Sequence, residues 1–205
     1  MIDKFKISEK DGQILVKTAR MIITEYLKKG SVKELEQQFR KDFSFKSGVF
    51  VTLKNPNGLR GCIGFTLPNK KLYNALKESS IAAAIEDPRF SPVTFEELDS
   101  ITVEVTILSP PSRIQVDDSQ EYLSKIKIGQ DGLIVNYGNN SGLLLPQVPI
   151  EYGWNEREYL ENTCEKAGLP KDFWKKKEIE IYKFEGIVFK EKYPNGEIIR
   201  ERLLD

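Results

Sequence analysis

Apolar residues recur at helical spacing in the first part of the chain. Between residues 9 and 29 they fall three or four positions apart, which gives a helix one apolar face. Gly30 follows directly and ends this helix, because glycine is favoured just past a helix C-terminus. The sequence Ser31–Glu34 has the form of a capping box and predicts a short second helix that extends through Phe39.

Two further stretches have the same helical spacing. The first covers residues 71–85, and Asp87-Pro88 ends it because a residue before proline disfavours the helical conformation. The second covers residues 155–167, where Asn155 can cap the first turn and Gly168 can end the last one. The pattern therefore predicts four helices.

Strand patterns lie between these helices. Residues 48–53 are rich in β-branched and aromatic side chains, Asn55–Gly58 has turn composition, and the strand pattern returns at Leu59. This order predicts a hairpin with Cys62 on its return arm. Residues 101–108 alternate between apolar and polar side chains, which is typical of a strand with one buried face.

The second half of the chain contains more strand signals. Residues 126–137 predict a hairpin that turns around Asp131-Gly132, and residues 139–142 form another turn before an apolar strand. Residues 180–189 alternate and are expected to close the sheet, with a polar tail after Tyr193. Hairpins mixed with separate helices predict an α+β fold with a largely antiparallel sheet flanked by helices.

The composition indicates a folded protein with a sizeable core. The chain has 205 residues, enough for one large domain or two intimate lobes, and 40% of them are apolar. Lysine plus arginine and aspartate plus glutamate number 31 each, and this balance opposes a dedicated nucleic-acid binder. No apolar run approaches the ~18 residues of a membrane span, and no secretory signal opens the chain. We expect a cytoplasmic protein, and the high charge content without histidine favours a thermophilic source.

The usual metal and nucleotide motifs are missing from the sequence. The two cysteines, Cys62 and Cys164, share no metal-ligand spacing, and the chain has no histidine. No glycine-rich phosphate loop occurs either, so the motifs imply no cofactor and we expect no metal site. Cys164 falls inside a predicted amphipathic helix, where core packing is the expected role.

The most informative motif is Leu59-Arg60-Gly61-Cys62-Ile63-Gly64. In an extended strand Arg60 and Cys62 project from the same side, and a nearby guanidinium would favour the reactive thiolate of Cys62. Gly61 and Gly64 leave the backbone bare, so a ligand can approach closely. The alternative is that Cys62 is a small buried residue and the glycines serve a bend.

Four other residues are candidates for the same site. Glu104 can act as an acid or base if its strand pairs near the hairpin, or it can simply face solvent. Asp87 and Arg89 can bind an anion, or they can form an ion pair that locks the turn. Gln147 can bind the edge of a substrate, or it can satisfy carbonyl groups of its own loop.

Several motifs in order along the chain resemble the AMMECR family, also called protein A of the AmmeMemoRadiSam system. The matching stretches are Leu59–Gly64, Ala82–Ala84 with Asp87–Val93, Gly142–Val148, and Gly153-Trp154 with Thr163–Leu169. The resemblance covers about residues 10 to 190 and implies one domain over residues 1–205 with two lobes, the larger built from both chain ends. It also implies two partners, a Memo-type protein and a radical-SAM enzyme, because family members often occur beside them.

The sequence leaves the function open between different classes of protein. The first hypothesis is an uncharacterised cytoplasmic enzyme, or enzyme component, that acts on a small organic molecule. Here Cys62 is the nucleophile or thiol donor, Arg60 tunes it, and Glu104 transfers protons. The alternative is a non-catalytic module that binds or scaffolds other proteins. Nucleic-acid binding is a third and weaker possibility, because the net charge is zero.

Overall fold

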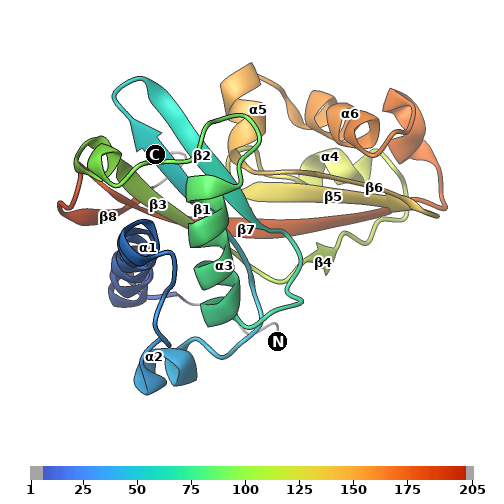
Figure 1. Cartoon of the computed structure of the whole chain (residues 1–205). Helices are drawn as coiled ribbons and strands as arrows, with labels where there is room; N and C mark the ends of the chain where they lie inside the picture. Colours follow the sequence, from blue (N-terminus) through green and yellow to red (C-terminus); the bar gives the residue numbers. More distant parts are fainter. Residues whose placement is uncertain (1–6, 202–205) are drawn as a thin grey trace. The chain divides into compact units, whose positions relative to one another are not determined.

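The computed structural model describes residues 7–201, which divide into two compact units (Figure 1). Unit 1 runs to Pro110 and includes Ile187–Glu201, and unit 2 comprises Pro111–Gly186. The strand pairs are antiparallel, and helices and hairpins follow one another without regular alternation. The fold is therefore α+β, as predicted, and the larger unit joins regions from both ends of the chain.

Unit 1 contains the Leu59–Gly64 motif. Its elements are α1 (Glu9–Lys29), α2 (Gln37–Asp42), β1 (Gly48–Asn55), β2 (Gly58–Phe65), α3 (Leu72–Ile85), the 3-10 helix η1 (Glu96–Ser100), β3 (Thr102–Leu108), the second half of β7 (Glu180–Glu191) and β8 (Ile198–Glu201). The strands follow the order β2-β1-β3-β7, and β8 also pairs with β7. The predicted hairpin is confirmed, and Cys62 lies on its return arm, β2.

Alternation along the strands produces the core of unit 1. Val51 and Leu53 on β1 and Val103 and Val105 on β3 are fully buried, and they belong to one apolar cluster with residues of α1 and α3. Because neighbouring side chains on a strand face opposite ways, Thr52 and Glu104 lie on the other face of the sheet. The polar face predicted for residues 101–108 is thus present.

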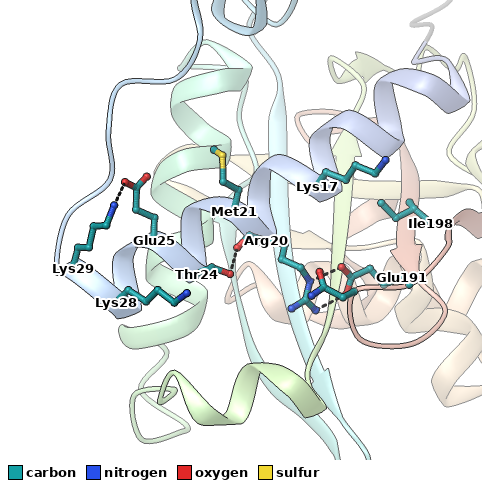
Figure 2. A pocket seen from close by; sticks show the side chains of 11 residues that line it. Lys17, Arg20, Met21, Thr24, Glu25, Lys28, Lys29, Glu191 and Ile198 are labelled. Carbon is teal, nitrogen blue, oxygen red and sulfur yellow. Dashed lines mark hydrogen bonds and ion pairs between the residues drawn. The ribbon is translucent and has the colours of Figure 1, made fainter.

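A buried ion pair ties α1 to the strands of unit 1 (Figure 2). Nε of Arg20 donates to Oε1 of Glu191 at 2.5 Å, and Nη2 of Arg20 donates both to Oε2 of Glu191 and to the carbonyl of Ile101. The backbone N–H of Val103 also donates to Oε2 of Glu191, at 3.0 Å. One carboxylate therefore connects a helix, the start of β3 and the end of β7.

Unit 2 has its own sheet and its own core. Its elements are β4 (Ser112–Arg113), α4 (Glu121–Lys125), the first half of β7, β5 (Asp131–Tyr137), β6 (Asn140–Leu144), α5 (Gln147–Tyr152), α6 (Glu156–Lys166) and the 3-10 helix η2 (Lys171–Lys175). β5 pairs with β6 and β7, and β4 pairs with the other edge of β7. Trp174 and Tyr159 are fully buried in the centre of this unit.

The prediction of the second helix is wrong in position. The helix starts at Gln37 and ends at Asp42, whereas the sequence predicted a start near Ser31. The backbone N–H of Lys33 donates to Oε2 of Glu25 at 3.3 Å, so the segment between α1 and α2 is bound to a side chain of α1. The other three helices agree with the prediction, and Gly30 ends α1 in a left-handed conformation with φ of 68°.

Two strand predictions also need correction. No hairpin turns at Asp131-Gly132; β5 begins there instead, because Asp131 and Lys127 close a turn just before it. The backbone N–H of Lys127 donates to Oδ2 of Asp131 at 2.9 Å. The expected polar tail after Tyr193 contains β8, because a turn at Tyr193–Gly196 sends the chain back along β7.

We predict that Glu191→Gln strongly destabilises the protein. The variant leaves the buried Arg20 without a charged partner, and breaking a buried pair in this way costs about 3–5 kcal/mol. Denaturant unfolding followed by circular dichroism measures the loss. The matched control is Glu197→Gln, which breaks an exposed pair with Lys192 and should cost under about 1 kcal/mol. Equal losses in the two variants would contradict the prediction.

Candidate functional site

Cys62 forms one end of a row of side chains that crosses three strands of unit 1. The strand register places Cys62 of β2 opposite Thr52 of β1, and Thr52 opposite Glu104 of β3. Oγ1 of Thr52 donates to Sγ of Cys62 at 3.3 Å. At the other end of the row, Nζ of Lys54 donates to Oε2 of Glu104 at 2.9 Å. The strand of Glu104 therefore pairs with the hairpin, which is the condition that the sequence analysis set, and β1 separates Glu104 from Cys62.

The row is mostly shielded from water. Thr52 and Glu104 are each 7% exposed, and Cys62 is half-buried. Glu104 therefore does not face solvent freely, which was the alternative reading of its position. Burial alone would lower the pKa of Lys54, but the hydrogen bond and negative charge of Glu104 raise it. Lys54 is thus the positive partner of a buried carboxylate.

Asp87 and Arg89 cover the free edge of β2 at Cys62. The backbone N–H of Cys62 donates to Oδ2 of Asp87 at 2.8 Å, and Nη2 of Arg89 lies 3.5 Å from the carbonyl oxygen of Cys62. Arg89 also donates two hydrogen bonds to the carboxylate of Asp87, from Nε at 2.9 Å and from Nη2 at 2.7 Å. β2 ends the sheet, so these side chains satisfy backbone groups that have no strand partner.

The guanidinium of Arg89 holds the pKa of Asp87 well below its usual range. Burial opposes this effect, while the backbone N–H groups of Cys62 and Arg89 add to it. Asp87 is therefore ionised throughout the physiological range and 5% exposed. Asp87 forms the ion pair with Arg89 that the sequence suggested, and it also accepts a hydrogen bond from the backbone N–H of Cys62.

Gly61 brings the end of α3 against β2. A Cβ atom at Gly61 would lie 2.1 Å from the carbonyl oxygen of Ala83, which no real side chain can do. The same contact sets Asp87, four residues further along, beside the N–H of Cys62. Gly64 is equally constrained, because its Cβ would lie 2.2 Å from the carbonyl oxygen of Val49. Packing within unit 1 therefore accounts for both glycines of the motif.

Arg60 contacts a loop and a carboxylate. The register shifts between Leu53 and Lys54, which pair with Gly61 and Leu59, so Arg60 is an extra residue that interrupts the alternation. Its Nε and Nη2 donate to the two oxygens of Glu97 at 2.9 and 3.0 Å, and Nη1 donates to the carbonyl of Ser91 at 2.8 Å. Arg60 thereby holds the loop after Asp87 on the edge of β2.

The electrostatics of Cys62 differ from the sequence expectation. Burial raises the pKa of Cys62, and the negative charges of Glu104 and Asp87 raise it further. The hydrogen bond from Thr52 and the charge of Arg89 act in the opposite direction but do not prevail. Arg60, which was expected to stabilise the thiolate, has its charge engaged by Glu97. At neutral pH Cys62 is therefore a thiol in this structure.

Comparison with known proteins places the chain in a family. A family model described as AMMECR1 matches residues 16–189. The chain belongs to the AMMECR1 family. It is 50% identical over 196 residues to a protein of Methanocaldococcus jannaschii, which covers 95% of this chain and 96% of that protein. A protein of Pyrococcus abyssi is 48% identical over 204 residues, with 97% of this chain and 99% of the other covered.

A solved AMMECR1-type structure agrees with the fold. The crystal structure of an uncharacterized protein from Pyrococcus horikoshii is 47% identical and has a TM-score of 0.87. The match covers 97% of this chain and 100% of that chain. The resemblance seen in the sequence is thus confirmed, and the archaeal relatives fit the composition expected of a thermophilic source. These relatives are themselves uncharacterised, so the comparisons establish the family without a reaction.

Two sequence candidates lie in unit 2. Cys164 is fully buried in α6, and burial raises its pKa to about 11, so it is an inert core thiol. Gln147 begins α5, and its Oε1 is buried without a hydrogen-bond partner among the described residues. Its role as a ligand-binding residue stays a prediction.

A separate cavity of about 600 Å³ lies along α1 in unit 1 (Figure 2). Two of its cations already have carboxylate partners, since Arg20 pairs with Glu191 and Lys29 pairs with Glu25. Its lining includes no cysteine.

Across residues 7–201, no group of three or more histidine, cysteine, aspartate or glutamate residues is placed to hold a metal ion. Over the same range no helix has the length and apolar character needed to cross a membrane.

Sequence reasoning missed three residues of the site. Thr52 and Lys54 lie on the outgoing arm of the hairpin, two positions apart and therefore on one face. Glu97 pairs with Arg60 although it lies 37 positions further along the chain, beyond α3. The predicted hairpin could have pointed to Thr52 and Lys54 as cross-strand neighbours of the motif. However, only the register shift beside Arg60 shows that Thr52 lies opposite Cys62.

We predict that Asp87→Asn destabilises the protein in a pH-dependent way. Because the folded-state pKa of Asp87 is depressed, its contribution is complete above the ordinary aspartate pKa of about 3.9 and is lost as pH falls toward the depressed value. The gap in Tm between wild type and variant should therefore be constant near neutrality and shrink below about pH 4. Asp99→Asn, at an exposed position of η1, is the control and should show no gap. A gap that widens on acidification would refute the assignment.

Proposed function

We propose that this AMMECR1-family protein is a cytoplasmic enzyme, or enzyme component, that acts on a small organic molecule through the thiol of Cys62. The observation that carries the proposal is the row of Cys62, Thr52 and Glu104 in register across three strands, closed by Lys54. A nucleophilic cysteine needs a base within reach and a fixed backbone. The row supplies a carboxylate, and Asp87 fixes the backbone.

Each residue of the row has a distinct part in the proposed chemistry. Cys62 attacks an electrophilic carbon of the substrate, and its proton must leave as the new bond forms because the thiol is protonated at rest. The hydroxyl of Thr52 contacts the sulfur, and Glu104 lies in register beyond it as the acceptor of that proton. Lys54 is the hydrogen-bonded cationic partner that positions the Glu104 carboxylate.

The other motif residues support this site through position. Arg60 and Gly61 fix the loop after Asp87 and the end of α3 on β2, and Gly64 lets β1 and β2 pack closely. Gln147, which lies in unit 2, is proposed separately as a ligand-binding residue of that unit. In keeping with the family, we propose that the protein works beside a Memo-type protein and a radical-SAM enzyme. No cofactor of its own is required by these residues.

One observation favours the non-catalytic alternative. Burial raises the pKa of Cys62, whereas many nucleophilic cysteines have a lowered pKa. If the protein is only a binding or scaffold module, Cys62→Ala should leave the affinity for its partner protein unchanged. The two proposals therefore differ in what the thiol does with an electrophile.

We predict that the folded protein forms covalent adducts at Cys62. The Cys164→Ala background is incubated with small thioesters, activated esters and Michael acceptors near neutral pH, and intact mass spectrometry counts the adducts. One adduct per chain should form, and Cys62→Ser should abolish it. Circular dichroism of both proteins checks that they are folded. Failure of the whole panel, with Cys62 alkylated only after unfolding, would reject the enzyme and leave the scaffold.

A second prediction isolates Glu104. Glu104→Gln removes a negative charge that raises the pKa of Cys62, so the midpoint of its pH–alkylation curve should move to lower pH. If Glu104 also accepts the proton, adduct formation per thiolate should fall in the same variant even though more thiolate is present. Glu78→Gln, an exposed carboxylate of α3, is the control and should change neither quantity. An unchanged midpoint would show that Glu104 does not act on Cys62.

A further inference from the structure

We infer that Arg89 binds an anionic group of the substrate, a carboxylate or phosphate carried by the electrophile that Cys62 attacks. This inference rests on the proposed function and adds the chemical class of the substrate. It comes from the way in which Asp87 holds one edge of the guanidinium and leaves the other edge unused.

The guanidinium of Arg89 is fixed on one side only. Nε and Nη2 donate to the two oxygens of Asp87, whose side chain is 3% exposed. The side chain of Arg89 is 54% exposed, and its Nη1 has no hydrogen-bond partner among the described residues. A buried carboxylate thus orients a planar cation that is more than half exposed. Such pre-orientation lowers the entropy lost when a carboxylate or phosphate binds.

The same contacts place the guanidinium of Arg89 beside the backbone of Cys62. One oxygen of Asp87 accepts both from Nη2 of Arg89 and from the backbone N–H of Cys62. Nη2 also lies 3.5 Å from the carbonyl oxygen of Cys62. The cation and the cysteine are therefore held by one shared carboxylate, and a small molecule bound to Nη1 can present its adjacent carbon to the sulfur.

Charge distribution favours an anion at this position. Asp87 and Arg89 cancel in net charge, but the carboxylate is buried and the guanidinium is exposed, so the accessible end of the pair is positive. Other cations near the row are engaged, since Lys54 pairs with Glu104 and Arg60 pairs with Glu97. The ring of Phe90 lies 5.4 Å from Cζ of Arg89 and adds an apolar surface next to the cation.

Two alkylating reagents of similar size, one anionic and one neutral, test the inference. Iodoacetate carries a carboxylate and iodoacetamide is neutral; with either, an S–C bond forms at Cys62, the C–I bond breaks, iodide leaves with its electron pair, and the thiol proton goes to Glu104 or water. The rates are measured on the Cys164→Ala protein at low ionic strength. Their ratio is then divided by the ratio for free cysteine, which removes the intrinsic difference between the reagents.

We expect this normalised ratio to favour iodoacetate by about fivefold or more, and to fall toward one in about 1 M salt. Arg89→Gln should bring the ratio to one, and Arg89→Lys should keep part of the preference because it keeps the charge without the fork. Lys70→Gln removes an exposed cation elsewhere in unit 1 and should leave the ratio unchanged. Inorganic phosphate and acetate, compared as protectants at equal ionic strength, distinguish a phosphate from a carboxylate as the preferred group.

The outcomes separate the inference from the proposed function. A normalised ratio near one in the unmutated protein, with Cys62 reacting with both reagents, overturns the role of Arg89 and leaves the nucleophile standing. A folded protein in which neither reagent modifies Cys62 overturns both. The salt dependence needs no variant, so the test holds even if Arg89→Gln unfolds, and circular dichroism identifies that case.

Discussion

The carboxylate of Asp87 is the group on which the Cys62 site depends. It accepts hydrogen bonds from the Cys62 backbone, from the Arg89 backbone and from two nitrogens of the Arg89 side chain. A buried carboxylate is stable only when it is paired and hydrogen-bonded, and here every partner belongs to β2 or to the turn after α3. The hydrogen bonds that stabilise the Asp87 carboxylate therefore hold β2, the turn after α3 and the side chain of Arg89 in fixed positions.

That arrangement rests in turn on close packing inside unit 1. Asp87 reaches Cys62 because Gly61 lets the last turn of α3 touch β2. The buried apolar residues of β1 and β3, and the buried ion pair of Arg20 and Glu191, stabilise the sheet to which β2 belongs. The row of Cys62, Thr52 and Glu104 lies on the opposite face of the same strands, so core packing on one face sets the register of the side chains on the other.

Local patterns in the sequence were sufficient for much of the fold. The helix ending at Gly30, the hairpin carrying Cys62 and the strand containing Glu104 all follow from periodicity and turn composition over short windows. The second helix was misplaced because the capping-box pattern at Ser31–Glu34 does not start a helix, and the N–H of Lys33 in that segment donates to Glu25 of α1. The site was predicted only in outline. The extra residue at Arg60 and the burial of Cys62 depend on which strands pair, and periodicity does not contain that information.

The electrostatic balance at Cys62 constrains any mechanism at this site. Burial, Glu104 and Asp87 all disfavour the thiolate, and only Thr52 and Arg89 support it. An anionic substrate bound to Arg89 would neutralise part of that support, so a free thiolate would become less stable as the complex forms. Attack and proton loss must therefore occur in one step, with the base already in place. Glu104, paired with Lys54 and in register with Thr52, is the base that the proposed function assigns to this step, and the raised pKa of Cys62 is compatible with that assignment.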